Sequence, residues 1–293
     1  MKLIVKYILT GMFICIFSSC EENLLDQEQY QKKIYLLSSD NNIFKYSHAL
    51  NDSITRGFIT VGSGGTIPLN KDVTVILELD TTSFSEYNRR NFDIDYDKYA
   101  KLLESSRYVL PSHEIVLRAG EIDATTFFPI EIDANGLSPD STYMVPFKIK
   151  STSDYEVNPE KASVLYQIEL KNKYTESGMN TYSMKGTKQP EGGSLSAITT
   201  TKVMAPLAKN KVRIFPENFL VSSKLKDIED KTITITVNND NTLRLKPFKH
   251  VMLEQLEGNR YIENEETFYL NYRYKLASDE KWITVTETLK RIK

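Results

Sequence analysis

The sequence is poor in the residues that most often carry chemistry. Its 293 residues include only 2 Cys and 3 His, which excludes most thiol chemistry and most metal sites built from these ligands. It has 12 Gly and 10 Pro, so it is neither collagen-like nor of low complexity. Positive charge is not in excess, since 37 Lys and Arg stand against 39 Asp and Glu, a formal net charge of -2. Because a nucleic-acid surface needs clustered positive charge, we expect no nucleic-acid partner.

The first residues have the order of a secretory signal. Two lysines in residues 1–6 precede the uncharged apolar run 7–17, and Ser18 and Ser19 follow it. This run of 11 residues is too short to span a hydrocarbon core, which takes about 20 helical residues. We therefore predict a signal peptide over residues 1–19, which is removed from the mature protein.

The residues around Cys20 refine this prediction. Phe17-Ser18-Ser19-Cys20 resembles a bacterial lipobox, although Leu is usual at its first position and Gly or Ala at its third. The resemblance implies that Cys20 is lipidated and that residues 20–30 form a tether. Glu21-Glu22 resembles the surface-export signal of Bacteroidetes lipoproteins, which implies a lipid anchor in the outer membrane and exposure at the cell surface. The alternative is an ordinary signal peptide that is cut near Ser19.

Beyond the tether, the dominant hydrophobic period is two. Ile233, Ile235 and Val237 alternate with threonines, which is the pattern of a half-buried strand. Since 40% of the residues are hydrophobic, the pattern predicts an all-β protein with substantial cores, built as β-sandwiches or barrels. Further strands are predicted at 33–37, 42–48, 57–61, 73–79, 114–118, 125–132, 143–150, 164–170, 182–188, 198–204, 211–215, 242–246, 268–276 and 281–286.

Helical spacing is rare, and one break divides the chain. A helix is predicted from Ser83 to about Leu103, capped by Ser83 or Ser85 and interrupted near Phe92, and a short second helix is expected near Asp227. The polar stretch 170–178 separates two groups of strands. We therefore predict a first β domain over residues 31–172, with one short helical excursion, and a second over 173–293, a β-sandwich or barrel-like fold.

Several motifs follow one another along the two predicted domains. Those of the first domain are 57–62, 72–75, 87–88, 91, 108–111, 116–121 and 137–147, and those of the second are 182–186, 268–274 and 282–289. With its motifs in this order, the first domain resembles a known family. It is similar to the immunoglobulin-like domain of unknown function that leads Bacteroidetes surface lipoproteins and some endo-β-N-acetylglucosaminidases, over about residues 25 to 170. The second domain is similar to the β-rich domain that accompanies this module in non-enzymatic members.

The resemblance implies a glycan-binding accessory protein without catalysis. Such a protein would bind oligo- or polysaccharide beside an outer-membrane glycan importer, with separate hydrolases. No hydrolase barrel follows the two domains in this sequence, so we expect no enzyme and no cofactor. A structural or adhesive cell-surface spacer is the alternative function, and a glycan hydrolase is a third.

The candidate catalytic and metal-binding motifs do not complete a site. Asp93, Asp95 and Asp97 resemble part of a calcium loop, but Lys98 stands where such a loop needs Gly, and a solvated acidic turn is the alternative. The three histidines, His48, His113 and His250, are far apart, and no Gly-x-Ser-x-Gly nucleophile motif occurs. We therefore predict no catalytic residue.

Aromatic residues are the remaining ligand-binding candidates. The sequence has 17 Tyr, 13 Phe and 1 Trp, and aromatic rings stack on the apolar faces of sugars, although Tyr is also a good strand residue. Tyr272 and Tyr274 share the apolar face of their strand, so we expect them in the core. Tyr269 should point the other way, Tyr261 should lie in the preceding loop, and Trp282 is core or surface, so these three are the candidate sugar contacts.

Overall fold

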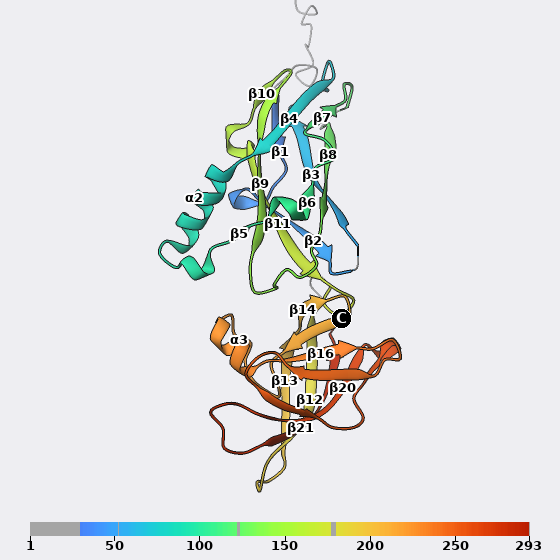
Figure 1. Cartoon of the computed structure of the whole chain (residues 1–293). Coiled ribbons are helices and arrows are strands. Elements are labelled where there is room, and N and C mark those ends of the chain that lie inside the picture. Colours follow the sequence, from blue (N-terminus) through green and yellow to red (C-terminus); the bar gives the residue numbers. More distant parts are fainter. Residues whose placement is uncertain (1–29, 52, 122–123, 177–179, 293) are drawn as a thin grey trace, which may run out of the picture.

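The computed structural model describes residues 30–292 except 52, 122–123 and 177–179. Strands dominate these residues, which form two domains that lie one above the other in Figure 1. The prediction of an all-β protein with two domains is confirmed. Cys20, the predicted signal peptide and the predicted tether up to residue 29 lie outside the described residues. Within the described part of the chain, no helix is both long and apolar enough to cross a membrane.

The first domain is a sandwich of two sheets. Residues at alternate positions of the strands face inward, so Ile34, Ile59, Val73, Phe147 and Tyr166 are fully buried between the sheets. The β3 sheet has the order β10 (Glu156–Val157), β1 (Lys33–Leu36), β3 (Thr55–Gly64), β8 (Thr125–Ile132), β6 (Tyr108–Val109). The β9 sheet has the order β2 (Ile43–Ala49), β11 (Ser163–Lys171), β9 (Tyr143–Thr152), β4 (Val73–Leu79), β7 (Glu114–Leu117), and β5 (Lys101–Leu102) also pairs with β9.

The second domain also places two sheets around one core. Tyr182, Phe268, Tyr272 and Tyr274 are fully buried there, which confirms the prediction for the two tyrosines of the last pair. The β21 sheet has the order β13 (Ser196–Val203), β12 (Thr181–Pro190), β21 (Ile283–Arg291), β20 (Thr267–Lys275), β18 (Met252–Gln255), and β19 (Arg260–Ile262) also pairs with β20. The β16 sheet has the order β14 (Ala205–Ala208), β15 (Lys211–Ile214), β16 (Ile233–Val237), β17 (Leu243–Pro247).

The helices differ from the prediction in their ends. Helix α2 spans Thr81–Phe92, and its N-cap is Asp80, not Ser83 or Ser85, because the Asp80 carboxylate accepts a hydrogen bond from the Ser83 backbone N–H. The prediction that it continues to about Leu103 is wrong. Asp93 has a φ of 47° and its N–H bonds to the Arg89 carbonyl, which ends the helix at the predicted interruption. Helix α3 spans Leu225–Lys231, as expected near Asp227.

Hydrophobic periodicity did not reveal the shortest elements. The strands β5, β6, β10, β14, β18 and β19, of two to four residues each, were not predicted. The four-residue strands β1, β7 and β15 were predicted, so a short strand is only sometimes detected. The described chain also has 3-10 helices at η3 (Asp40–Asn42), η4 (Tyr96–Lys98), η5 (Ser105–Arg107), η6 (Pro159–Lys161) and η7 (Glu263–Glu265).

Two polar contacts join the domains. The Asn172 side-chain amide, just after β11, donates to the carbonyl oxygens of Ala208 at 2.7 Å and Lys211 at 3.1 Å. Arg213 on β15 donates to Asp140, which lies in the turn before β9, with an Nη1–Oδ2 distance of 2.5 Å. The Arg213 side chain is only 5% exposed. These bonds fix the end of the first domain against the second, opposite the end where β10 pairs with the start of β1 (Figure 1).

Candidate functional site

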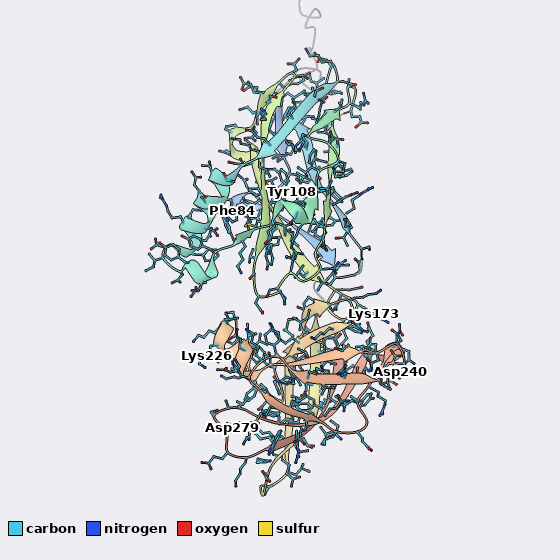
Figure 2. All side chains as sticks on the ribbon, viewed as in Figure 1. Phe84, Tyr108, Lys173, Lys226, Asp240 and Asp279 are labelled. Carbon is cyan, nitrogen blue, oxygen red and sulfur yellow. The ribbon has the colours of Figure 1, made fainter. Side chains whose placement is uncertain are left out.

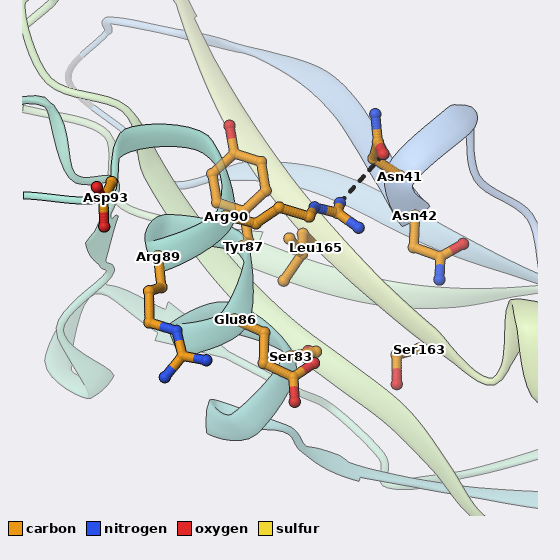
Figure 3. Close-up of a pocket in the computed structure, with 10 residues that line it drawn as sticks. All are labelled: Asn41, Asn42, Ser83, Glu86, Tyr87, Arg89, Arg90, Asp93, Ser163 and Leu165. Atoms are coloured by element: carbon orange, nitrogen blue, oxygen red, sulfur yellow. Dashed lines mark hydrogen bonds between the residues drawn. The ribbon is translucent and has the colours of Figure 1, made fainter.

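A groove of about 560 Å³ lies in the first domain between α2 and the segments at η3 and β11. Figure 3 shows Tyr87 and Arg90 on the helix side and the two asparagines of η3 on the opposite side. Ser163 and Leu165 of β11 line the groove between them. The groove is therefore built from three segments that lie about 40 and 70 residues apart in the sequence.

Buried contacts on the side of α2 that faces the protein hold this helix in place beside the groove. Phe84, labelled in Figure 2, packs with Met144 and Leu165 in a small cluster against which Tyr87 is half-buried. The buried Asn88 side chain donates to the Ala100 carbonyl at 3.0 Å and accepts from the Ala100 N–H at 2.8 Å. Because Phe84 and Asn88 face the protein, the helix period directs other residues of α2 to the groove.

Polar groups converge on the groove. Arg90 donates through Nη2 to the Asn41 side-chain oxygen at 3.1 Å, which bridges its two walls (Figure 3). Asn41 and Asn42 have φ values of 61° and 58°, in the left-handed region that Asn tolerates better than most residues. The Asn42 amide donates to the Glu160 carbonyl at 3.0 Å. Both asparagines are thus held where their side chains border the groove.

A buried carboxylate supports the β11 side. The Ser163 hydroxyl donates to Asp80 at 2.9 Å, and Asp80 is only 7% exposed. Burial opposes ionisation of Asp80, but hydrogen bonds from Ser163 and Ser83 outweigh it and lower the pKa of this carboxyl. Asp80 therefore stays ionised at neutral pH and fixes both the start of α2 and the hydroxyl of Ser163.

This arrangement suits a neutral, hydroxyl-rich ligand. Guanidinium, amide and carboxylate groups of Arg90, Asn42 and Glu86 offer both donors and acceptors, and Tyr87 adds an aromatic ring. In the part of the chain that the structure describes, no group of three or more His, Cys, Asp or Glu is placed to hold a metal ion. The groove thus provides binding chemistry of the kind that sugar hydroxyls and sugar ring faces require.

The aromatic candidates from the sequence do not lie at this groove. Tyr261 was expected in a loop, but it lies in β19 and is 4% exposed, so it is a core residue with no face for a ligand. Its inward direction follows from pairing with Phe268. Tyr269 and Trp282 are half-buried on the outer side of the second domain, and each has a guanidinium over its ring.

The acidic candidates do not converge either. Asp93 ends α2 and lies at the rim of the groove, whereas Asp95 forms an ion pair with Lys98 at 2.8 Å. Asp97 is exposed in η4. His48 is fully buried between Thr55 and Tyr166. His113 is exposed directly before β7, and His250 contacts Asp230 at the protein surface. These positions give no common catalytic centre for the histidines.

The sequence did not predict as ligand contacts the groove residues Asn41, Asn42, Glu86, Tyr87, Arg90 and Ser163. The groove depends on the return of β11 alongside η3, a contact across about 120 residues that periodicity does not encode. The pair Asn41-Asn42 before a strand is the only local signal, because consecutive asparagines favour left-handed turn conformations.

Family models cover most of the chain. An N-terminal-domain model matches residues 30–156, and a C-terminal-domain model matches residues 162–290. The chain belongs to the family of proteins that combine these two domains. No curated protein matches the sequence.

Several solved structures have the same two-domain fold. A protein of unknown function from Bacteroides ovatus has a TM-score of 0.64 and 14% identity, covering 88% of this chain and 94% of its own. A multidomain protein including DUF1735 from the same species has a TM-score of 0.61 and 14% identity, covering 88% and 95%. An auxiliary nutrient binding protein from Bacteroides thetaiotaomicron has a TM-score of 0.56 and 13% identity, covering 86% and 92%. At these identities the likeness shows the fold alone.

Proposed function

We propose that this protein is a non-catalytic glycan-binding lipoprotein of the outer-membrane surface, and that the groove beside α2 binds the sugar. The observation that carries the proposal is the groove itself, in which the Tyr87 ring lies near hydrogen-bond donors and acceptors from three segments of the chain. The name of the nutrient-binding relative supports the same class of function. An outer-membrane glycan importer and separate hydrolases are the partners that this function requires.

Substitutions in the groove provide the first test. Tyr87→Ala and Arg90→Ala should each weaken binding at least about tenfold, a loss of about 1.4 kcal/mol, because they remove a ring face and a charged donor. Isothermal titration of the chain after Cys20 against N-glycans, mannans and plant polysaccharides measures this. Tyr96→Ala is the matched control, since Tyr96 is 71% exposed and does not line the groove.

Two results would contradict the groove assignment. Absence of binding to every glycan in the panel would contradict the proposed function. Equal losses of affinity in the Tyr87 and Tyr96 variants would contradict the groove as the binding site, because a ring outside the groove would then contribute as much as one inside it.

Membrane attachment depends on one side chain in this proposal. Cys20→Ala should abolish lipidation, so the protein should be released or keep its uncleaved signal peptide, since a run of 11 apolar residues does not anchor a cleaved chain. Detergent phase partitioning with mass spectrometry of the N-terminus measures both outcomes. Cys15→Ala, inside the apolar run, is the matched control and should remain lipidated.

Anchoring and exposure have separate tests. A correctly cleaved Cys20→Ala protein that still enters the detergent phase completely would require another anchor. Protease shaving of intact cells should degrade the wild-type protein if it lies on the outer face. An anchor before β1 would attach the first domain at the end away from the second, so the second domain would face outward (Figure 1).

A structural spacer is the second candidate function. The Arg213–Asp140 pair and the Asn172 bonds join the domains end to end, as a rigid spacer requires. A wild-type chain that binds no glycan yet is exposed at the cell surface would favour this function.

A further inference from the structure

The outer face of the β21 sheet carries a local excess of positive charge. Registers and alternating burial place five cations on the described strands of this face, and Glu254 is the only carboxylate at an outward-facing position of these strands. Glu265, in η7 before β20, also reaches this face, where its carboxylate lies 3.5 Å from the Tyr269 hydroxyl. The whole chain has a net charge of -2, so this face differs from the rest of the protein. Mixed signs in balance are usual on a solvent-facing sheet, and a face with an excess of one sign attracts ligands of opposite charge. The five cations are Lys185 on β12, Arg260 on β19, Arg273 and Lys275 on β20, and Lys290 on β21.

Strand pairing places Lys185 and Arg260 in one row across the sheet, whereas Arg273 shares its row with Glu254. One row runs across the sheet from Lys185 through Thr288 and Tyr269 to Arg260. A second row contains Arg273, four residues farther along β20, or about 14 Å at the usual rise of an antiparallel strand. The row between them is uncharged and holds a hydrogen bond from the Thr286 hydroxyl to Asn271 at 3.1 Å.

The two outward-facing aromatic rings are part of the same surface. The Arg260 guanidinium carbon lies 4.6 Å from the ring centre of Tyr269, and that of Arg273 lies 5.0 Å from the ring of Trp282. Arg273 also donates through Nε to Glu254 at 2.7 Å. These contacts hold both guanidinium groups against the sheet. By contrast, Lys185, Lys275 and Lys290 form no ion pair with any residue that the structure describes.

From this face we infer a second binding surface, which takes an anionic polysaccharide that carries carboxylate or sulfate groups. Cations spaced over several strands complement charges repeated along a chain, and the threonine and asparagine side chains between them complement sugar hydroxyls. A nucleic acid fits less well, since bases stack on open aromatic faces and both rings here already have a guanidinium over them. The inference goes beyond the groove and does not depend on it.

Charge variants of the chain after Cys20 test this surface. Polygalacturonate supplies carboxylates, dextran sulfate supplies sulfates, and dextran is the neutral comparison. Wild type should bind at least one anionic polymer in isothermal titration, more weakly as salt rises because salt screens exposed charges. The triple variant Lys185→Gln, Lys275→Gln, Lys290→Gln should lose at least about tenfold in affinity, or about 1.4 kcal/mol.

A matched triple separates a defined surface from general charge attraction. Lys101→Gln, Lys224→Gln and Lys246→Gln remove the same charge from exposed positions elsewhere, so this protein should bind as wild type does. An equal loss in both triples would overturn the inference, as would equal binding of dextran or tighter binding of single-stranded DNA or phosphatidylglycerol vesicles. Arg90→Ala should leave binding of the anionic polymer intact, so a failure at the groove and a failure at this face are distinguishable.

Discussion

Replacing Lys202 with alanine is expected to lower the unfolding free energy of the second domain by about 3–5 kcal/mol, the usual cost of breaking a buried ion pair. Lys202 on β13 is 3% exposed, and Glu287 on β21 is 1% exposed. The Lys202 ammonium lies 2.9 Å from Glu287 Oε2 and donates to the Phe215 carbonyl at 2.6 Å. Alanine would leave the Glu287 carboxylate buried without its counter-charge.

Neighbouring tyrosines make this cluster larger than one pair. Tyr272 donates to Glu287 at 2.8 Å, while Tyr274 donates to Glu217, which also pairs with Lys188. Burial, and then the Glu287 charge, raise the pKa of Tyr272 well above its usual value, so the phenol remains a donor. Burial lowers the pKa of Lys202, while the attraction of Glu287 opposes that shift. The cluster ties the loop after β15 to four strands of the domain.

The single tryptophan reports on this domain. Trp282 precedes β21, so its fluorescence during urea unfolding follows the second domain without a signal from the first. Lys185→Ala, an exposed lysine on the adjacent strand, should change the unfolding free energy by less than about 0.5 kcal/mol. Lys202→Met combined with Glu287→Gln should recover most of the loss, because no charge is then buried at this pair and the side-chain amide oxygen still accepts from Tyr272. A stable Lys202→Ala protein with wild-type fluorescence would contradict the assigned role of the pair.

The fold was predictable where the periodicity was long. Nine-residue β20 alternates its apolar residues so regularly that Tyr272 and Tyr274 were placed in the core correctly. The same rule did not predict that Lys202 and Glu287 are buried, since a charged residue at an inward position interrupts the hydrophobic alternation of its strand. Their compensation comes from pairing across strands that are 85 residues apart in sequence, which local analysis does not detect.

Candidate ligand contacts were less predictable than the core. Tyr269 was correctly directed outward by strand alternation, whereas Tyr261 was placed in a loop because three-residue β19 has no recognisable period. The basic outer face was also not predictable from the sequence, because only the strand register brings Lys185, Arg260 and Lys290 to the same face. Overall charge balance excluded a cationic protein but did not exclude a cationic face.

Acidification should destabilise the first domain through His48. Burial, and then the charge of Lys171, lower the pKa of His48 from 6.5 to about 4. Tyr166 and Thr55 contact its two ring nitrogens at 2.7 and 2.8 Å. Since Thr55 also donates to the Ile132 carbonyl, Thr55 accepts from His48 Nδ1–H and Tyr166 donates to Nε2. Protonation of Nε2 would remove the acceptor that Tyr166 uses.

The expected loss has a defined pH window. The unfolded chain gains a proton on His48 near pH 6.5, whereas the folded chain gains it only near pH 4. The stabilisation present above pH 6.5 is therefore lost as the pH falls toward 4, by about 3 kcal/mol in total at 1.36 kcal/mol per pKa unit. Urea unfolding followed by circular dichroism, with Trp282 fluorescence marking the second domain, measures the loss across this range.

Replacement of the imidazole provides the control for this pH dependence. His48→Gln keeps a side-chain amide near Tyr166 but does not titrate, so the first domain should have nearly constant stability between pH 6.5 and about 4. Asp72, Asp80 and Asp154 have pKa values lowered by hydrogen bonds, Asp80 despite its burial, and they affect stability below this window. An equal pH slope in the His48→Gln protein would show that groups other than this buried histidine cause the acid sensitivity.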